Sequence, residues 1–415
     1  MTVRGAWSQV DSVINVDSTF KMDQPFERLH AGGMEKLDTK VNEGALGRAR
    51  EAGGLEGVSV ADTSLSAVDG AAGALIYRGS PIEALAGVRS YEALAHLLWR
   101  GELPGEEALA ELRAGLGAAR VAAFARLDSI GDALAAEDAM DALRAAMSHL
   151  RAPNGGGDPV AVTGAVGTFV AAWIRRRRGE APVAPDARLG HAHDLLRMAL
   201  GEADAAAVGA LEAYLGTVMD HGMNASTFTA RVVASTGSDL VSAVVAAIGA
   251  LKGPLHGGAP GPVLDMLDAI GEAEAAGAWL RGEVAAGRRI MGMGHRVYRV
   301  RDPRAAVLER QATRLGDSPA RGRRLALARA VEAEAEALLA ERYPERRLRA
   351  NVEFYTAIVL EAVGLPREAF AATFAAGRVV GWCAHVDEQR RSGRLIRPRA
   401  RYVGPLPEGM GASQG

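Results

Sequence analysis

The sequence predicts a mostly helical protein of two domains. Apolar residues recur every three or four positions in most of the chain, which is the spacing of an amphipathic α-helix. Aromatic residues make up only 5% of the chain and alanine is frequent, so we expect a core of helices in close contact. The 415 residues exceed what one hydrophobic core usually supports, which predicts the second domain.

Charge, cysteine content and hydropathy exclude several classes of protein. The 48 Lys and Arg residues nearly balance 50 Asp and Glu residues, which argues against nucleic acid as the main partner. The single cysteine, Cys383, excludes an intrachain disulfide framework and is typical of a reducing compartment. The longest uncharged, mostly apolar run, Val160 to Ile174, has 15 residues. A membrane span needs about 20. With no recognisable signal peptide, these features predict a cytoplasmic protein without a membrane or nucleic-acid partner.

Residues 1–50 lack sustained periodicity and are expected to form an N-terminal extension. Between residues 54 and 79, alternating apolar residues and glycine turns predict short strands or hairpins. Helical periodicity then recurs in segments separated by breaks, which are 81–150, 158–174, 186–201, 204–219, 240–251, 262–285, 303–342, 352–364 and 368–390.

Several helix boundaries are marked by capping residues or glycine. Asp158 as N-cap and Pro159 at the first helical position predict the start of one buried helix. Ser238 is the predicted N-cap of the helix over 240–251, and an interruption is expected near Gly316.

His256 lies in a break that neither a helix nor a strand can cross. Gly253 and Pro254 end the preceding helix, and residues 260–262 (Pro-Gly-Pro) prepare the next helix start. A ring beside a helix N-terminus is disfavoured as imidazolium, so we expect a neutral side chain that donates a hydrogen bond. Such a group could stabilise a developing enolate oxygen. A packing turn with an incidental histidine would give the same pattern.

Two further histidines stand next to glycine. His221 follows a helix end and precedes Gly222. His295 follows Gly294, and four arginines occur in the next nine residues. Guanidinium groups pair bidentately with carboxylates and phosphates, so this segment suits an acidic ligand, although a solvated basic loop would look alike.

Glu353 lies in the apolar sequence NVEFY, residues 351–355. Burial raises the pKa of a carboxyl group, which suits a general base. The alternative is a glutamate that the helix dipole favours in the first turn of a helix.

Isolated arginines complete the candidate site. Arg378 interrupts an apolar helix and needs an anionic partner, either an internal carboxylate or a bound acid. Arg397 lies in the tail, where a solvated role is the ordinary interpretation. Together with the histidines and Glu353, these arginines suggest a small polycarboxylic acid as substrate and carbon–carbon bond chemistry. His191 and His193 would point to different faces of a helix, and no metal site is predicted.

Taken together, the motifs of the chain resemble those of the citrate synthase family from about Gly54 to Gly404. The motifs that carry the resemblance are GLEGV at 54–58, LIYRG at 75–79, HLLWRGELP at 96–104, NASTFTARVVAST at 224–236, GPLHGGAP at 253–260, MGMGHRVYRVRDPR at 291–304, NVEFY at 351–355, GRVVGW at 377–382 and RPRARYVG at 397–404.

The resemblance implies a predominantly helical, two-domain fold with short N-terminal strands. The large domain would comprise residues 51–259 and 366–415, and a smaller mobile domain, residues 260–365, would close over the substrate. The family assembles as homodimers or dimer-based hexamers. The implied activity is that of a citrate (Si)-synthase, an acyltransferase of the tricarboxylic acid cycle that condenses acetyl-CoA with oxaloacetate and hydrolyses citryl-CoA. Coenzyme A would be a co-substrate, with no permanently bound cofactor.

The resemblance also implies roles for the candidate residues. His256 would hydrogen-bond the thioester oxygen of the enolate, Glu353 would take the methyl proton, and His295 would polarise and protonate the ketone. His221, Arg304 and Arg378 would bind oxaloacetate, and Arg397 would reach across the subunit interface. Arg299 falls where the family contacts the phosphates of coenzyme A.

The sequence departs from the family pattern at Glu353, where the usual base is aspartate. The extra methylene moves the carboxylate by about 1.5 Å, and a misplacement of that size can cost about 100-fold in rate. Three alternatives therefore remain: a 2-methylcitrate synthase that uses propionyl-CoA, a catalytically reduced member that acts as a binding or assembly partner, and a lyase that runs the reverse cleavage.

Overall fold

The computed structural model describes residues 54–55, 57–151, 157–256, 260–295, 298–316, 318–400, 402 and 404–405, without the side chain of Ser392. The predicted N-terminal extension, residues 1–50, lies outside this part. The chain divides into two compact units, Met1–Val60 and Ala61–Gly415. Every helix and strand described below belongs to the second unit.

A small antiparallel sheet begins the second unit. Its strands are β1 (Ser66–Asp69), β2 (Ala74–Tyr77) and β3 (Ser80–Pro81), paired in that order. Ser66 pairs with Tyr77, which places both side chains at the same end of the hairpin. The predicted strands are confirmed here, but the alternating residues Val58 and Val60 form none.

The remaining elements are helical, which confirms the predicted fold class. They are α2 (Ile82–Leu85), α3 (Tyr91–Arg100), α4 (Glu106–Phe124), α5 (Ala139–Ser148), α6 (Pro159–Arg177), α7 (His191–Leu200), α8 (Ala205–Val218), α9 (Ala225–Ser235), α10 (Leu240–Leu251), α11 (Gly261–Ile270), α12 (Ala276–Ala285), α13 (Pro303–Leu315), α14 (Pro319–Arg342), α15 (Val352–Val363) and α16 (Phe370–Ser392).

Helix boundaries follow the capping chemistry of the sequence, with two corrections. In addition, helix α9 was not predicted, although the Asn224 side chain caps it by accepting the N–H of Thr227 at 3.1 Å. Asp158 caps α6 as predicted, and its carboxylate accepts a hydrogen bond from the backbone N–H of Val160 at 2.9 Å. The N-cap of α10 is Asp239 and not Ser238, because the Asp239 carboxylate reaches the N–H of Ser242 at 2.9 Å. The segment predicted as one helix over 262–285 is two helices, because Gly271 adopts a φ of 76° and ends α11.

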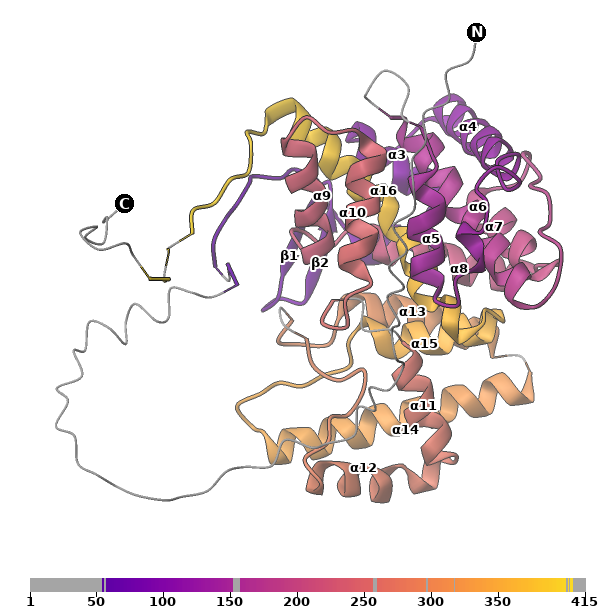
Figure 1. Cartoon of the computed structure of the whole chain (residues 1–415). Coiled ribbons are helices and arrows are strands. Elements are labelled where there is room, and N and C mark those ends of the chain that lie inside the picture. Colours follow the sequence, from indigo (N-terminus) through magenta and orange to yellow (C-terminus); the bar gives the residue numbers. More distant parts are fainter. Residues whose placement is uncertain are drawn as a thin grey trace, which may run out of the picture. The chain divides into compact units, whose positions relative to one another are not determined.

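Helix α16 forms the centre of the upper group of helices in Figure 1, where it packs against α3, α5, α6, α8, α9 and α10. Its buried side chains include Val379, Val380 and Trp382. It crosses the end of α8 so closely that a Cβ on Gly381 would lie 2.1 Å from the carbonyl oxygen of Met219. This contact brings the middle of α16 to the turn that follows α8.

Helices α13 and α15 connect this group to the lower helices. Figure 1 shows them between α8 above and α11 and α14 below, and they pack against each other and against α8. Their N-terminal ends hold Arg304 and Glu353. The division into a large domain and a small domain of residues 260–365 stays a prediction.

In the part of the chain that the structure describes, no helix combines the length and the apolar composition of a membrane span.

The contact between α16 and α8 predicts opposite effects for two glycine-to-alanine substitutions. Gly381→Ala forces a methyl group against the backbone and should destabilise the protein by about 3 kcal/mol. Gly209, on α8, has no atom within 4 Å of the position that a Cβ would take, so Gly209→Ala should stabilise the helix. The expected gain is about 0.5–1 kcal/mol. Urea unfolding of both variants measures the difference, and equal effects would contradict the close contact.

Candidate active site

The segment that carries His295 is bonded to the segment that precedes α15. Gly294 donates its N–H to the Arg349 carbonyl at 2.7 Å, and Asn351 donates its N–H to the Gly292 carbonyl at 2.9 Å. Met293 and Ala350 form an isolated antiparallel bridge between these bonds. The loop before α13 and the start of α15 are therefore held side by side by their backbones.

Asp302 joins the starts of α13 and α15. It is buried, and its carboxylate accepts hydrogen bonds from the N–H of Arg304 at 3.0 Å and from the Arg304 guanidinium at 3.0 and 2.7 Å. The same carboxylate accepts a bond from the N–H of Val352, the first residue of α15, at 3.2 Å. Burial opposes the charge of Arg304, but Asp302 raises the pKa of this guanidinium above its ordinary value.

His295 is a neutral hydrogen-bond donor. Its Nδ1 accepts the backbone N–H of Tyr298 at 3.1 Å, which assigns the ring proton to Nε2. Burial, followed by the nearby charge of Arg304, lowers the pKa of His295 to about 4. The ring is therefore neutral at physiological pH and presents an N–H.

His221 lies edge-on to His295, with 5.4 Å between the ring centroids. It follows α8, and its Nε2 is 3.3 Å from the hydroxyl of Tyr298. Burial, then the charges of Arg304 and Arg378, keep the pKa of His221 well below its ordinary value. His221 and His295 are thus two uncharged rings beside two cations.

Glu353 is the carboxylate of this cluster. The side chain of Asn351 orients the first turn of α15, which carries Glu353. Its amide oxygen accepts the backbone N–H of Glu353, and its amide nitrogen donates to the Gly294 carbonyl, both at 2.9 Å. Burial raises the pKa of Glu353 to about 7, against the opposing charge of Arg304. Its carboxylate makes no ion pair with a described residue, so it can exchange a proton near neutral pH.

His256 meets the N-terminus of α9, which lies 30 residues before it in the chain and was not predicted as its neighbour. Its Nε2 accepts the backbone N–H of Ser226 at 3.1 Å and lies 2.8 Å from the Ser226 hydroxyl. Trp382 of α16 donates its indole N–H to that hydroxyl at 3.1 Å. The ring proton is therefore on Nδ1, and the helix dipole opposes a second proton. The residues after it, 257–259, lie outside the described part.

Arg378 is buried in α16 and faces the end of α8. Its Nε donates to the Val218 carbonyl, and the guanidinium carbon lies 4.6 Å from the centre of the Phe374 ring. Burial lowers the pKa of Arg378 to about 10, and the charge of Asp220 opposes this most strongly. The guanidinium remains charged at neutral pH without an ion pair among the described residues, which suits it to an anionic ligand.

Two predicted arginines lie apart from this cluster in the single chain. Arg299 is exposed and donates its backbone N–H to the Gly70 carbonyl at 2.7 Å. Arg397 is exposed in the extended tail that follows α16. Neither side chain bonds to His221, His295 or Arg378 within the described residues.

Four residues that organise the cluster were not predicted from the sequence, namely Asp302, Tyr298, Ser226 and Asn351. Asp302 could have been found, because an acidic residue directly before Pro303 is a typical helix start. The roles of Tyr298 and Ser226 depend on contacts between distant segments. No local pattern indicates them.

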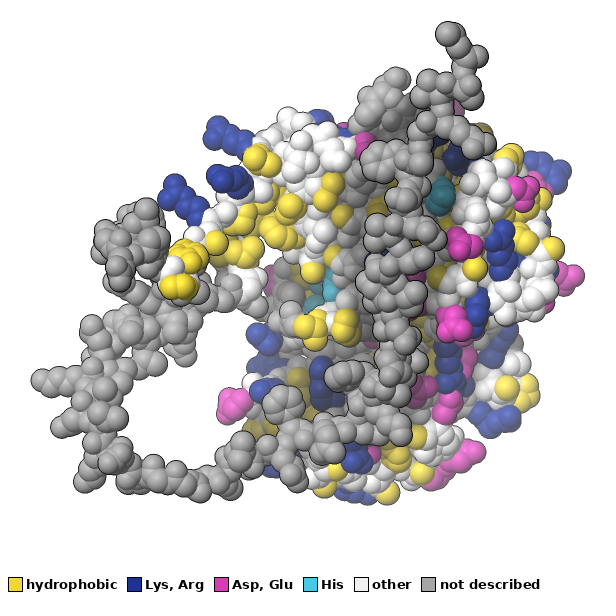
Figure 2. Space-filling model, in the orientation of Figure 1, with side chains coloured by type: hydrophobic (Ala, Val, Ile, Leu, Met, Phe, Trp, Pro, Cys, Tyr) yellow, Lys and Arg dark blue, Asp and Glu magenta, His cyan; other side chains and the backbone are white. Residues whose placement is uncertain are grey.

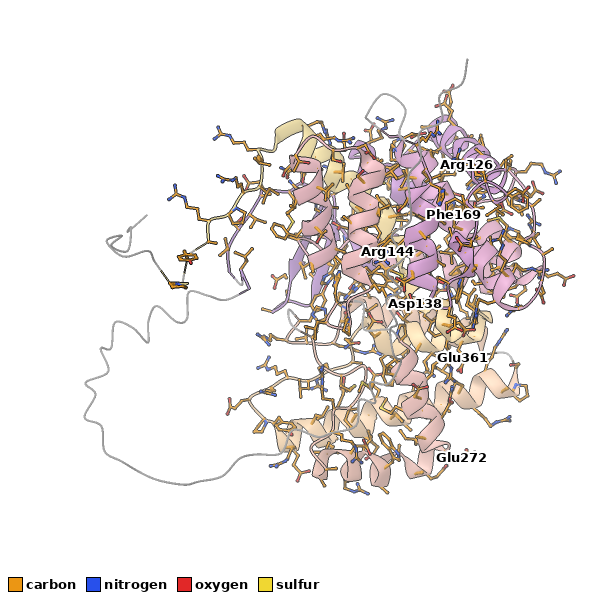
Figure 3. All side chains as sticks on the ribbon, viewed as in Figure 1. Arg126, Asp138, Arg144, Phe169, Glu272 and Glu361 are labelled. Atoms are coloured by element: carbon orange, nitrogen blue, oxygen red, sulfur yellow. The ribbon has the colours of Figure 1, made fainter. Side chains whose placement is uncertain are left out.

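Figure 2 shows histidine side chains near the middle of the visible face, with Lys and Arg side chains below them. A separate pocket of about 630 Å³ lies between α13, α14 and α15, and none of the predicted site residues lines it. Figure 3 labels two residues that line this pocket, Glu361 on α15 and Glu272 in the turn after α11. Its Arg324 already pairs with Glu361 at 2.6 Å and with Asp268 at 2.5 Å. The pocket is therefore distinct from the cluster of histidines.

Comparisons with known proteins agree on one family. Residues 54–399 match the family model described as "Citrate synthase, C-terminal domain". The chain is 40% identical over 374 residues to "Putative citrate synthase 2" of Mycobacterium tuberculosis, with 85% of this chain and 93% of that protein covered. It is 39% identical over 368 residues to "Citrate synthase" of Haloferax volcanii, covering 85% and 95%. It is also 39% identical over 365 residues to "2-methylcitrate synthase" of Mycobacterium tuberculosis, covering 85% and 90%.

Solved structures give the same result. Citrate synthase from Pyrobaculum aerophilum superposes with a TM-score of 0.77 at 36% identity, covering 85% of this chain and 92% of that one. A ternary complex of carboxymethyl coenzyme A and oxaloacetate with citrate synthase from Thermoplasma acidophilum superposes with a TM-score of 0.77 at 28% identity. It covers 86% of this chain and 97% of that one.

The pKa of Glu353 predicts a pH-dependent contribution to stability. Because this pKa is raised to about 7, the folded state holds a proton that the unfolded state releases at lower pH. The contribution of Glu353 to stability is therefore lost as the pH rises through about 7. Glu353→Gln cannot ionise, so the variant does not lose this contribution. The melting temperature of the variant minus that of wild type should therefore be larger at pH 8 than at pH 5, values about one unit above and two units below that pKa.

The matched control is Glu341→Gln, at an exposed glutamate on α14. Its effect on the melting temperature should be the same at both pH values, because the side chain is exposed to solvent. If Glu353→Gln shifted the melting temperature by the same amount at pH 5 and pH 8, the raised pKa of Glu353 would be contradicted.

Proposed function

Since the chain belongs to the citrate synthase family, we propose that it is a citrate synthase of the Si type. It condenses acetyl-CoA with oxaloacetate and hydrolyses citryl-CoA to citrate and coenzyme A. The observation that carries this proposal is the combination of a carboxyl group with a pKa of about 7, neutral histidines and two buried arginines. A positioned base, hydrogen-bond donors for an oxyanion and cations for carboxylates are what this reaction requires.

The proposed reaction begins at Glu353. Its carboxylate takes a proton from the methyl group of acetyl-CoA, and the C–H electron pair forms the enolate. The Nδ1–H of His256 hydrogen-bonds the enolate oxygen, because Nε2 already accepts the Ser226 N–H. One preorganised donor of this kind is typically worth about 2.7–4 kcal/mol of barrier.

The enolate carbon then attacks the ketone carbon of oxaloacetate. The Nε2–H of His295 polarises the ketone oxygen and gives it a proton as the carbon–carbon bond forms. Arg304 and Arg378 bind the two carboxylates, and His221 contacts the same substrate. Water then cleaves the thioester of citryl-CoA, which releases citrate and the thiol of coenzyme A.

We also propose the family's domain closure and assembly. His221, His256 and Arg378 belong to the predicted large domain, whereas His295, Arg304 and Glu353 belong to the predicted small domain. Closure of residues 260–365 would bring both sets onto the substrate and exclude water.

In a homodimer or dimer-based hexamer, Arg397 would reach the partner's site, and its exposure in the tail supports this role. Arg299 would contact coenzyme A. A cytoplasmic location stays a prediction.

A 2-methylcitrate synthase is the second candidate. The relative with that name is 39% identical to this chain, the same as the Haloferax volcanii citrate synthase. One methylene in an apolar pocket changes discrimination by only about 1–3 kcal/mol, so overlap between acetyl-CoA and propionyl-CoA is expected.

Thiol release from each acyl-CoA with oxaloacetate tests the function. We expect turnover of acetyl-CoA by wild type, retained by Glu353→Asp and reduced by about 100-fold or more in Glu353→Gln, because the amide cannot accept a proton. Preference for propionyl-CoA would assign a 2-methylcitrate synthase. No thiol release from folded protein that binds oxaloacetate would leave the binding-partner alternative, and activity only from citrate and coenzyme A would indicate the lyase.

The pH profile of kcat/KM for acetyl-CoA should rise through about pH 7, because Glu353 must lose its proton in the free enzyme. His295, with a pKa of about 4, stays neutral over the same range and adds no second step. Steady-state rates between pH 5.5 and 8.5, about 1.5 units on either side, measure the profile. A flat profile across pH 7 would assign proton abstraction to another group.

A further inference from the structure

Asp220, the residue before His221, is the centre of a buried hydrogen-bond network outside the proposed reaction. Its carboxylate accepts a hydrogen bond from the hydroxyl of Ser66 at 2.6 Å. Each of the two carboxylate oxygens also lies 3.2 Å from Nε2 of His385. Its backbone N–H donates to the Tyr77 hydroxyl at 3.0 Å, and Gly222 donates its N–H to Ser66 Oγ at 3.1 Å. The strands β1 and β2 thus hold the backbone on both sides of His221.

The tautomer of His385 is set from its other side. Arg231, which can only donate, places Nη1 3.0 Å from Nδ1 of His385. The proton of the ring is therefore on Nε2 and points to Asp220. Glu388 neutralises Arg231 at 2.7 Å, and Gln389 accepts from its Nε at 2.9 Å.

This arrangement holds the carboxylate of Asp220 between the hydroxyl of Ser66 and the Nε2–H of His385. Burial alone would raise the pKa of Asp220, but His385 and Ser66 outweigh it and the pKa lies below its ordinary value. Arg378 lies beside this network, because its Nε donates to the carbonyl of Val218, two residues before Asp220. A Cβ on Gly381, about one turn further along α16, would lie 3.2 Å from the Cβ of Asp220. The charge of Asp220 supports the positive form of Arg378 more than any other group. The two side chains nevertheless form no ion pair in the described part of the chain.

We propose that the carboxylate of Asp220 supplies a permanent negative charge beside the part of the site that binds oxaloacetate. His385 is the positioning residue that keeps Asp220 from forming an ion pair with Arg378. The inference rests on the proposed function, in which Arg378 binds a carboxylate of oxaloacetate. Asp220 stabilises the buried guanidinium without a direct ion pair. Ser66 and His385 hold the carboxylate in place, so the guanidinium stays available to the substrate.

The physical reason is the strength of a buried ion pair. Two opposite charges attract strongly where water is excluded, and a direct Asp220–Arg378 pair would have to break before a substrate carboxylate could bind. A buried arginine with no negative charge nearby would be costly in the substrate-free protein. A counter-charge that is near but restrained avoids both problems.

The first test compares His385→Leu with His385→Gln in the full-length protein. The leucine variant removes the Nε2–H, so Asp220 can move to Arg378 and the KM for oxaloacetate should rise about tenfold. The KM for acetyl-CoA and kcat should change less than about twofold, because the residues that act on the acyl group are untouched. Glutamine retains an N–H donor and should restore most of the oxaloacetate affinity.

The second test is a double-mutant cycle measured by calorimetric titration of oxaloacetate. In the Asp220→Asn background, His385→Leu should no longer weaken oxaloacetate binding, because no carboxylate remains to compete for Arg378. Asp220→Asn alone should lower the melting temperature of the substrate-free protein, and oxaloacetate should raise it by more than it does in wild type. The added substrate replaces the missing negative charge.

His191 offers a matched control. It is also fully buried, and its Nδ1 lies 3.4 Å from an arginine, Arg120. His191→Leu should reduce the melting temperature without changing the affinity for oxaloacetate. If His385→Leu does not fold, Ser66→Ala removes the other hydrogen bond to Asp220 and should weaken oxaloacetate binding in the same direction.

The outcomes separate this inference from the proposed function. Wild type that neither binds oxaloacetate nor releases thiol overturns the proposed function itself. Wild type that binds oxaloacetate normally, with an unchanged affinity in His385→Leu, overturns only the role of His385. An effect of His385→Leu that persists undiminished beside Asp220→Asn would show that His385 acts on general structure and not through Asp220.

Discussion

The candidate site depends first on one carboxylate, that of Asp302. It receives three hydrogen bonds from Arg304 and one from the start of α15. The arginine proposed to bind substrate and the helix that carries the proposed base therefore share a single anchor. The same anchor keeps the loop of His295 beside Asn351, because the backbone of Asp302 also bonds to the Ala350 carbonyl at 3.2 Å. Geometry of this kind cannot be changed at one group without moving the others.

Local patterns in the sequence predicted most of the helices but not α9, because amphipathic spacing and capping residues act within a few positions of each other. The errors were also local. A carboxylate one residue after Ser238 was the better cap, and a single glycine at 271 ended a helix whose apolar spacing continued. The short strands were correct where glycine turns bounded the alternation, but Val58 and Val60 pair with no strand in the described part of the chain.

The candidate site was predictable only in its chemical groups. Histidines beside glycine, an arginine in an apolar helix and a carboxylate in an apolar sequence are visible in the chain, and the raised pKa of Glu353 follows from its burial. The partners are not visible, since Ser226 and His256 lie 30 residues apart and Asp302 and Val352 lie 50 residues apart. Contacts over such separations follow from helix packing, which no capping or periodicity rule specifies.

Two of the histidines receive their tautomer from the main chain. A backbone N–H meets Nδ1 of His295 and another meets Nε2 of His256. An amide proton belongs to every residue except proline, so exchange of the Ser226 or Tyr298 side chain leaves the donor in place. Most point substitutions around each ring should therefore leave unchanged which ring nitrogen carries the proton. Insertions, deletions or proline, which move or remove the amide itself, are the changes that would reverse it.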